Sequence, residues 1–116
     1  MIIDMVVGVG IIELWLGDCM SLKEKRSLLS RLLSRTRREF NITLAEVGAN
    51  DEWRRAIIGF STVGNDRRHI NGRIDCVVGF IEGLNLAEIA ASRFEILNFN
   101  TESISSGYGE DKYDEL

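Results

Sequence analysis

The chain has 116 residues, of which 45% are apolar and 28% are charged, a composition typical of one globular domain and too short for two. The net charge of −4 is uneven, because residues 1–97 hold 13 basic and 13 acidic side chains while residues 98–116 hold Lys112 against five acids. Asp4 and Glu13 interrupt the apolar N-terminal stretch, and no apolar run reaches the ~20 residues that cross a bilayer, so we expect a cytoplasmic protein with no membrane contact.

The first half of the chain predicts a strand, a helix and a hairpin. Met5–Leu16 is β-branched and apolar at both parities, which is typical of a central strand covered on both faces. Ser21–Phe40 has apolar residues at helical spacing, and Ser21 with Glu24 forms the pattern of a capping box. Ile42–Val47 and Ala56–Val63 predict two strands, and the short connection between them makes an antiparallel hairpin.

The second half predicts another helix and a last strand. Asp66 is the expected N-cap and Gly83 the expected C-cap of a helix whose apolar face comprises Ile70, Ile74, Val77, Val78 and Ile81. Leu86–Phe99 is ambiguous, because its first residues favour a helix while Ala90–Ile96 alternates in polarity as a strand does. We choose a strand, since a fourth strand completes the sheet.

The resulting order, βαββαβ, is the split-βαβ or ferredoxin-like arrangement. We therefore predict an α+β domain over residues 5–99, with a four-stranded antiparallel sheet and two helices on one of its faces. Residues 100–116 are rich in Ser, Gly and acids, and predict an acidic, disordered tail.

The predicted first helix is strongly basic, with seven Lys or Arg residues and the single acid Glu24 between residues 23 and 38. At about 100° per residue, Lys23, Arg31, Arg35 and Arg38 point away from the apolar stripe, while Arg26 and Arg37 flank it. Such cations can bind phosphates without reading a base sequence. The candidate phosphate-binding residues are Lys23, Lys25, Arg26, Arg31, Arg35 and Arg38.

Three of these cations lie at the start of the helix. There the helix dipole disfavours Lys23, Lys25 and Arg26 by about 0.3–1 kcal/mol each. A phosphate that shares the exposed backbone amides with them would explain their position. Neutralisation by nearby acids, either Asp18 or those of the 51–52 turn, is the alternative explanation and the one that we rank first, and the sequence leaves both interpretations open.

Nothing in the sequence predicts a catalytic site, a cofactor or a metal site. The only histidine, His69, is expected to be solvated or to cap the second helix at its start, and no phosphate loop, nucleophile elbow or metal-ligand spacing is present. Gly8-Val9-Gly10 lacks the third glycine of a dinucleotide fingerprint, so we interpret it as close backbone packing under a helix. For the cysteines, we expect a buried thiol at Cys76 and a loop thiol at Cys19.

Several short motifs resemble the YlxP-like family of small bacterial proteins, which is classed as a domain of unknown function. They are Val6-Val-Gly8, Ser21-Leu-Lys-Glu-Lys-Arg26, Ala45-Glu-Val-Gly48, Asp51-x-Trp53-x-Arg55-Ala56 and Asn65-Asp66. The resemblance covers about residues 5–97 and leaves out Met1–Asp4 and the acidic tail. It implies a ferredoxin-like fold and no established activity. Members are often encoded beside a ribosome-binding factor, which implies a link to the ribosome or to RNA.

Two functions of different classes fit these observations. The first is a non-catalytic accessory factor that binds RNA or the ribosome through the basic helix. We choose the helix over the sheet because the strand at 56–61 lacks the aromatic pattern of an RNA-recognition sheet. The alternative is a dimeric scaffold or small-ligand regulatory module whose basic helix is only solvated; an enzyme ranks third. The sheet face without helices would expose apolar residues of Met5–Leu16 and Ala56–Val63, which predicts a homodimer through this face.

Overall fold

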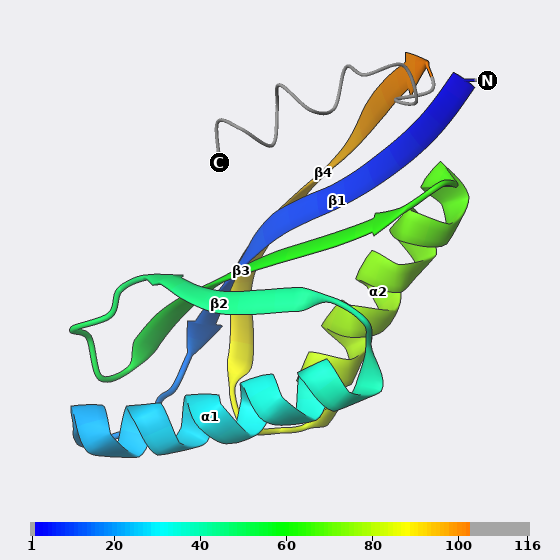
Figure 1. The fold of residues 1–116 in the computed structure, drawn as a ribbon. Helices are drawn as coiled ribbons and strands as arrows, with labels where there is room; N and C mark the ends of the chain where they lie inside the picture. The colour runs from blue at the N-terminus through cyan, green and yellow to red at the C-terminus, as the bar shows by residue number, and fades with distance from the viewer. Residues whose placement is uncertain (1, 103–116) are drawn as a thin grey trace.

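The computed structural model describes residues 2–102, and its elements follow the predicted βαββαβ order (Figure 1). The strands and helices are β1 (Ile2–Trp15), α1 (Leu22–Glu39), β2 (Thr43–Gly48), β3 (Arg55–Gly64), α2 (Arg67–Gly83) and β4 (Glu88–Glu102). The ferredoxin-like α+β fold is therefore confirmed, as is the strand interpretation of the ambiguous last element.

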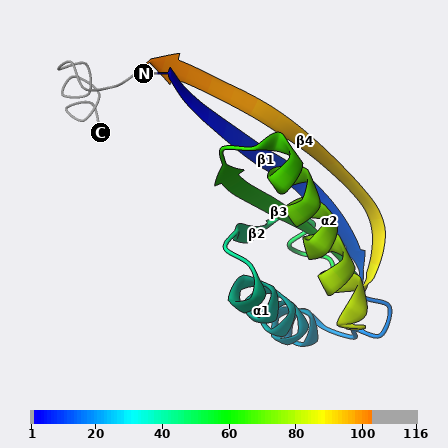
Figure 2. The same ribbon diagram turned by 90° about the vertical axis from the view of Figure 1, so that its right-hand side faces the viewer.

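The four strands form one antiparallel sheet in the order β2-β3-β1-β4. β1 lies in the centre and pairs with both β3 and β4, so that Gly10 faces Phe60 on one side and Phe94 on the other. The pairing of β1 with β3 ends at Val6, whereas the pairing of β1 with β4 continues to Ile2. These two strands consequently extend as a two-stranded ribbon beyond the rest of the sheet (Figures 1 and 2).

The ends of this ribbon lie outside the predicted domain limits. β1 includes Ile2–Asp4, and residues 100–102 of the predicted tail form the end of β4, where Asn100 pairs with Asp4. The remainder of the predicted tail, residues 103–116, lies outside the described residues.

Both helices pack on the same face of the sheet, as predicted (Figure 2). Side chains at alternate positions of β1 and β3 are buried against them, for example Ile12 and Leu14 of β1 and Ile58 of β3. The helices contribute Leu29 and Leu32 from α1 and Ile70, Ile74, Val77 and Ile81 from α2. β1 was expected to be covered on both faces. Within residues 2–102 it is covered on one, because both helices lie on the same side.

Each helix begins at a side-chain cap. At α1 the Ser21 hydroxyl accepts a hydrogen bond from the Glu24 amide at 3.1 Å. The Glu24 carboxylate accepts from the Met20 amide at 2.6 Å, one residue before the position used in a standard capping box. Asp66 caps α2 as predicted, by accepting from the Arg68 amide at 2.8 Å.

The predicted end of α2 was wrong. Gly83 is the last helical residue and Leu84 is the C-cap. The left-handed position that commonly follows a helix is taken by Asn85, with φ of 54°. Asparagine tolerates this conformation better than most residues, so no glycine is needed there.

Among residues 2–102, no helix combines the length and the apolar character that crossing a membrane would require.

Candidate functional site

Five of the six predicted phosphate-binding residues lie exposed on α1: Lys23, Arg26, Arg31, Arg35 and Arg38. All but Arg26 lie within roughly one third of the circumference of the helix, since successive residues turn by about 100°. Among residues 2–102, none of the five side chains forms a salt bridge or a hydrogen bond. We call these five side chains the α1 basic surface.

Lys25, the sixth predicted residue, lies inside the protein and cannot belong to that surface. Its side chain is only 1% exposed, and its Nζ donates a hydrogen bond to the Ala49 carbonyl at 2.6 Å. Glu46 Oε2 lies 3.0 Å from the same nitrogen and supplies the opposite charge without an aligned hydrogen bond. Neutralisation by a nearby acid is thus correct for Lys25, but the acid comes from β2 rather than from Asp18 or the 51–52 turn.

The spacing along α1 could have revealed this burial. Lys25, Leu29, Leu32 and Thr36 are separated by four, three and four residues, which is the spacing of one helical face. All four are buried. A cation in register with the apolar stripe therefore indicated an internal ion pair.

A hollow of about 660 Å³ lies beside the start of α1. Lys23, Ser27 and Arg31 follow one another along it at intervals of four residues, but Asp18 and Glu24 also line it. An anion placed there would meet carboxylates as well as cations. The helix start is therefore a weaker anion site than the sequence suggested, and the second half of α1 carries the stronger basic character.

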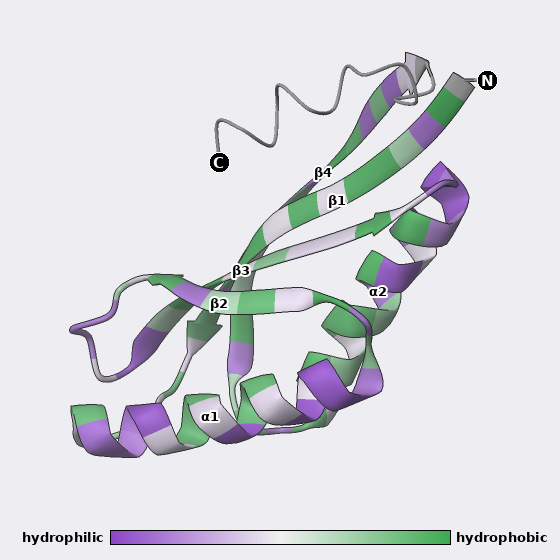
Figure 3. Ribbon diagram, in the orientation of Figure 1, coloured by the Kyte–Doolittle hydropathy of each residue, from purple (hydrophilic) through white to green (hydrophobic). Residues whose placement is uncertain are grey.

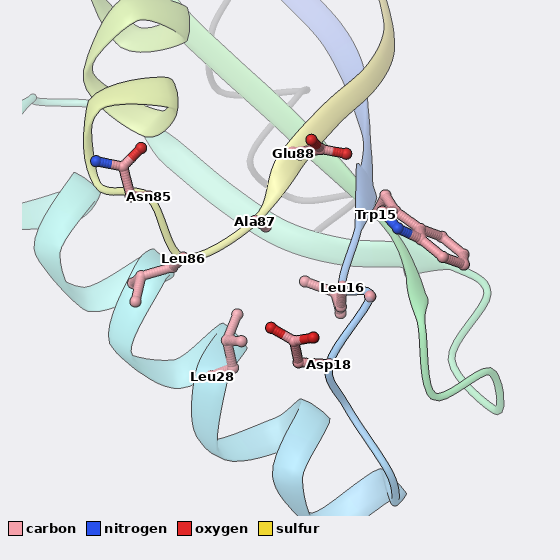
Figure 4. A pocket seen from close by; sticks show the side chains of 9 residues that line it. Trp15, Leu16, Asp18, Leu28, Asn85, Leu86, Ala87 and Glu88 are labelled. Carbon is pink, nitrogen blue, oxygen red and sulfur yellow. The ribbon is translucent and has the colours of Figure 1, made fainter.

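A second pocket, of about 400 Å³, lies between the end of β1, α1 and the connection from α2 to β4 (Figure 4). Leu16, Leu28 and Leu86 supply apolar walls, and Asp18 and Glu88 supply carboxylates. In Figure 4 the Asp18 carboxylate lies between Leu16 and Leu28. None of the described residues that line this pocket is a cation, so they do not match a phosphate.

The titratable groups described outside α1 include the exposed His69 and a surface group of ion pairs around Arg55. His69 is exposed at the start of α2, as expected. Arg55 forms ion pairs with Glu13 at 2.8 Å and with Glu52 at 3.2 Å, and its hydrogen bond lowers the pKa of the Glu13 carboxyl. Glu52, in the turn between β2 and β3, is thus paired with Arg55 rather than with a cation of α1. Among residues 2–102, no group of three His, Cys, Asp or Glu side chains could hold a metal ion.

The predicted burial of Cys76 was wrong, since this thiol is exposed on α2. Cys19 lies in a loop as predicted, in the connection between β1 and α1, but it is the buried one of the two cysteines. Burial raises the pKa of the Cys19 thiol, and the carboxylates of Glu24 and Asp18 add to the effect. Cys19 should therefore be poorly reactive in the folded protein.

Thiol labelling at neutral pH tests which of the two cysteines is exposed. We expect one rapid equivalent of reaction with an aromatic disulfide reagent in native protein, from Cys76, and a second only after denaturation. The variant Cys76→Ser should lose the rapid equivalent, while Cys19→Ser should keep it. Rapid labelling of native Cys76→Ser would contradict the burial of Cys19.

The interpretation of these glycines as close packing under a helix is confirmed for Gly8 and wrong for Gly10, where the close neighbour is the strand β4. A Cβ at Gly8 would lie 2.7 Å from Ile70 Cγ2, so this glycine lets α2 approach the sheet. A Cβ at Gly10 would collide with the Phe94 ring and lie 2.7 Å from the Arg93 carbonyl, so this glycine accommodates the neighbouring strand.

Comparison with known proteins identifies relatives over most of the chain. Residues 7–94 match the family described as "Protein of unknown function (DUF503)". "Uncharacterized protein YlxP" of Bacillus subtilis (strain 168) is 33% identical over 89 residues, which cover 77% of this chain and 97% of that protein. Among solved structures, the de novo designed protein Foldit4 is similar over 86% of this chain and 99% of its own, with a TM-score of 0.42 and 17% identity.

Proposed function

This chain belongs to the family of proteins of unknown function DUF503, and because that description assigns no activity, we propose a function from the molecule's own surface: it is a non-catalytic factor that binds RNA, free or within the ribosome, through the α1 basic surface. The YlxP-like resemblance of the motifs is confirmed. The relatives' names carry no information about RNA, so the proposal rests on the charges of α1.

The observation that carries the proposal is the set of cations left without partners on one side of α1. The other arginines of the described chain have side-chain partners, as Arg37 has in the Leu44 carbonyl and Arg73 in the Thr62 hydroxyl, with the single exception of Arg68 on α2. Unpaired cations spaced along a helix repel one another and favour an anionic partner with repeated charges. A phosphate backbone has this property, and binding to it needs no aromatic platform on the sheet.

Titration of a single-stranded RNA at two salt concentrations tests the proposal. Four outward cations, Lys23, Arg31, Arg35 and Arg38, predict a slope of log K against log salt of about −3, which is a loss of affinity of about 60-fold between 50 and 200 mM. The variant Arg31→Glu/Arg35→Glu/Arg38→Glu keeps one of these four cations, so the magnitude of the slope should fall below about 1. Because all three side chains are exposed, the melting temperature should change little.

The charge-matched control is Arg67→Glu/Arg68→Glu/Arg73→Glu on α2, which has the same net charge as the α1 variant; because Arg67 and Arg73 have partners in the folded chain, its melting temperature is measured alongside to verify that it is folded. We expect this control to keep most of the salt-dependent binding of the wild type, because the lost charges lie on the other helix. Absence of salt-dependent binding by the wild type at low ionic strength would overturn the proposed function. Equal loss of binding in the two variants would show that net charge, not the α1 basic surface, is responsible.

A further inference from the structure

The sheet face opposite the helices exposes an unusual amount of apolar surface. The register places Val7 of β1 beside Val63 of β3 and Leu97 of β4, and places Met5 beside Phe99. These positions alternate with the buried ones, so they share the open face. Its large exposed side chains are Met5, Ile11, Trp15, Val47, Val63, Leu97 and Phe99. β1 is hydrophobic along much of its length in Figure 3.

We propose that this open face binds a second copy of the chain, forming a homodimer with the helices on its outside. The face extends from Met5 to Trp15, about 33 Å at the rise of a strand, and is about 14 Å wide across β3, β1 and β4, with β2 widening it to about 19 Å over its six residues. This is roughly 500 Å² in flat projection, and the protruding side chains raise the accessible area towards the roughly 800 Å² that each partner buries in a standard interface. A face of this extent that exposes large apolar side chains is typical of an interaction site.

The charges on the open face favour a second copy over a nucleic acid. Arg93 and Glu95 project from the edge strand β4, midway along its length, 3.3 Å apart and both well exposed. The other charged pair on this face, Arg55 with Glu13, is also balanced. A contact related by twofold symmetry places residue i against residue j in both directions. Such a contact can therefore set Arg93 of each copy opposite Glu95 of the other, with no like charges facing.

Two further features support this occupant. The ribbon formed by Ile2–Met5 and Phe99–Glu102 extends beyond β3, and an isolated two-stranded ribbon is marginally stable in water. A second copy would cover its apolar side, which carries Met5 and Phe99. Near the centre, Gly10 and Gly59 help to form a depression of about 390 Å³, which could receive a side chain of the other copy.

The dimer is independent of the proposed RNA binding, because α1 lies on the other side of the sheet and stays accessible in either state. Loss of one property should leave the other intact. The two proposals can therefore fail separately.

Light scattering during size-exclusion chromatography tests the dimer. At about 50 μM, a concentration suited to interfaces of standard size with micromolar or tighter affinity, we expect the wild type to show twice the mass of one chain. Leu97→Lys should give a monomer with an unchanged circular dichroism spectrum, since Leu97 is exposed. The matched control Met20→Lys alters an exposed apolar residue away from the face and should stay dimeric. A monomeric wild type, or a dimeric Leu97→Lys, would overturn the proposal.

A charge exchange tests the proposed contact between Arg93 of one copy and Glu95 of the other without altering apolar surface. Arg93→Glu and Glu95→Arg should each be mainly monomeric alone, because each would place four like charges around the symmetry axis. Mixed in equal amounts, they should form a heterodimer in which the charges are again complementary. Stable dimers of either variant alone, or no association in the mixture, would overturn the proposed arrangement.

Discussion

Replacing Lys25 with alanine should lower the free energy of unfolding by about 3–5 kcal/mol, because removing one partner of a buried ion pair leaves the other charge uncompensated. Glu46, which is 22% exposed, would lose its cation, and the Ala49 carbonyl would lose its hydrogen bond. Ala49 itself has a left-handed φ of 57°, so the turn after β2 depends on this support. Denaturant unfolding followed by circular dichroism measures the effect.

Two variants serve as controls for this prediction. Lys23→Ala removes an exposed cation from the same helical turn and should change stability by less than about 0.5 kcal/mol. The double variant Lys25→Met/Glu46→Leu replaces the pair with apolar side chains and should recover most of the lost stability, as buried pairs often tolerate such replacement. A cost below about 1 kcal/mol for Lys25→Ala would show that the ion pair does not stabilise the fold.

Replacing Gly10 with valine should destabilise the sheet by about 3 kcal/mol, at the upper end of the usual effect of overpacking. The new Cβ would meet the Phe94 ring and the Arg93 carbonyl, and backbone atoms cannot turn aside as a flexible side chain can. Phe94 packs edge-to-face against Phe60 at 5.8 Å between ring centroids, so moving its ring would disturb a second strand. Thermal and denaturant unfolding of the variant measure the cost.

The matched control is Gly79→Ala on α2. A Cβ at Gly79 meets nothing within 4 Å, so alanine should stabilise the helix by about 0.5–1 kcal/mol. Opposite signs at the two sites would confirm that the requirement for glycine comes from neighbouring atoms. A Gly10 variant as stable as the wild type would contradict the close packing of β4 on β1.

Helix-capping residues and the spacing of apolar residues were sufficient to predict the order of the strands and helices. Ser21 and Asp66 cap their helices, and the spacing from Ile70 to Ile81 gives the buried face of α2. The same spacing could have placed Cys76 correctly, since it directly precedes the inward-facing Val77 and so points about 100° away from it. The burial of Cys19 could not be predicted, because it depends on the path of the connection between β1 and α1. In that connection the Cys19 carbonyl accepts a hydrogen bond from Arg54, which is distant in the sequence.

Among the candidate site residues, the pairing of Lys25 with Glu46 could not be predicted from the sequence. The sequence gives the face of a helix on which a residue lies, but not the residue of another element that approaches this face. Motif residues behind the family resemblance have structural roles: Ser21 caps α1, Lys25 pairs with Glu46, and Arg55 pairs with Glu13. The motifs therefore identify the fold more directly than the function.

The position of β1 also determines the order in which the protein can fold. Its two neighbours are β3 and β4, and the pairs Leu14 with Ile89 and Met5 with Phe99 join segments from opposite ends of the described chain. During synthesis, the residues through Gly64 can form β1, β2 and β3 while one edge of β1 has no neighbour. Long-range pairing of this kind is slow, and an unpaired apolar edge is a template for association with other chains. A nascent chain that pauses before β4 is made is therefore the species most prone to aggregate.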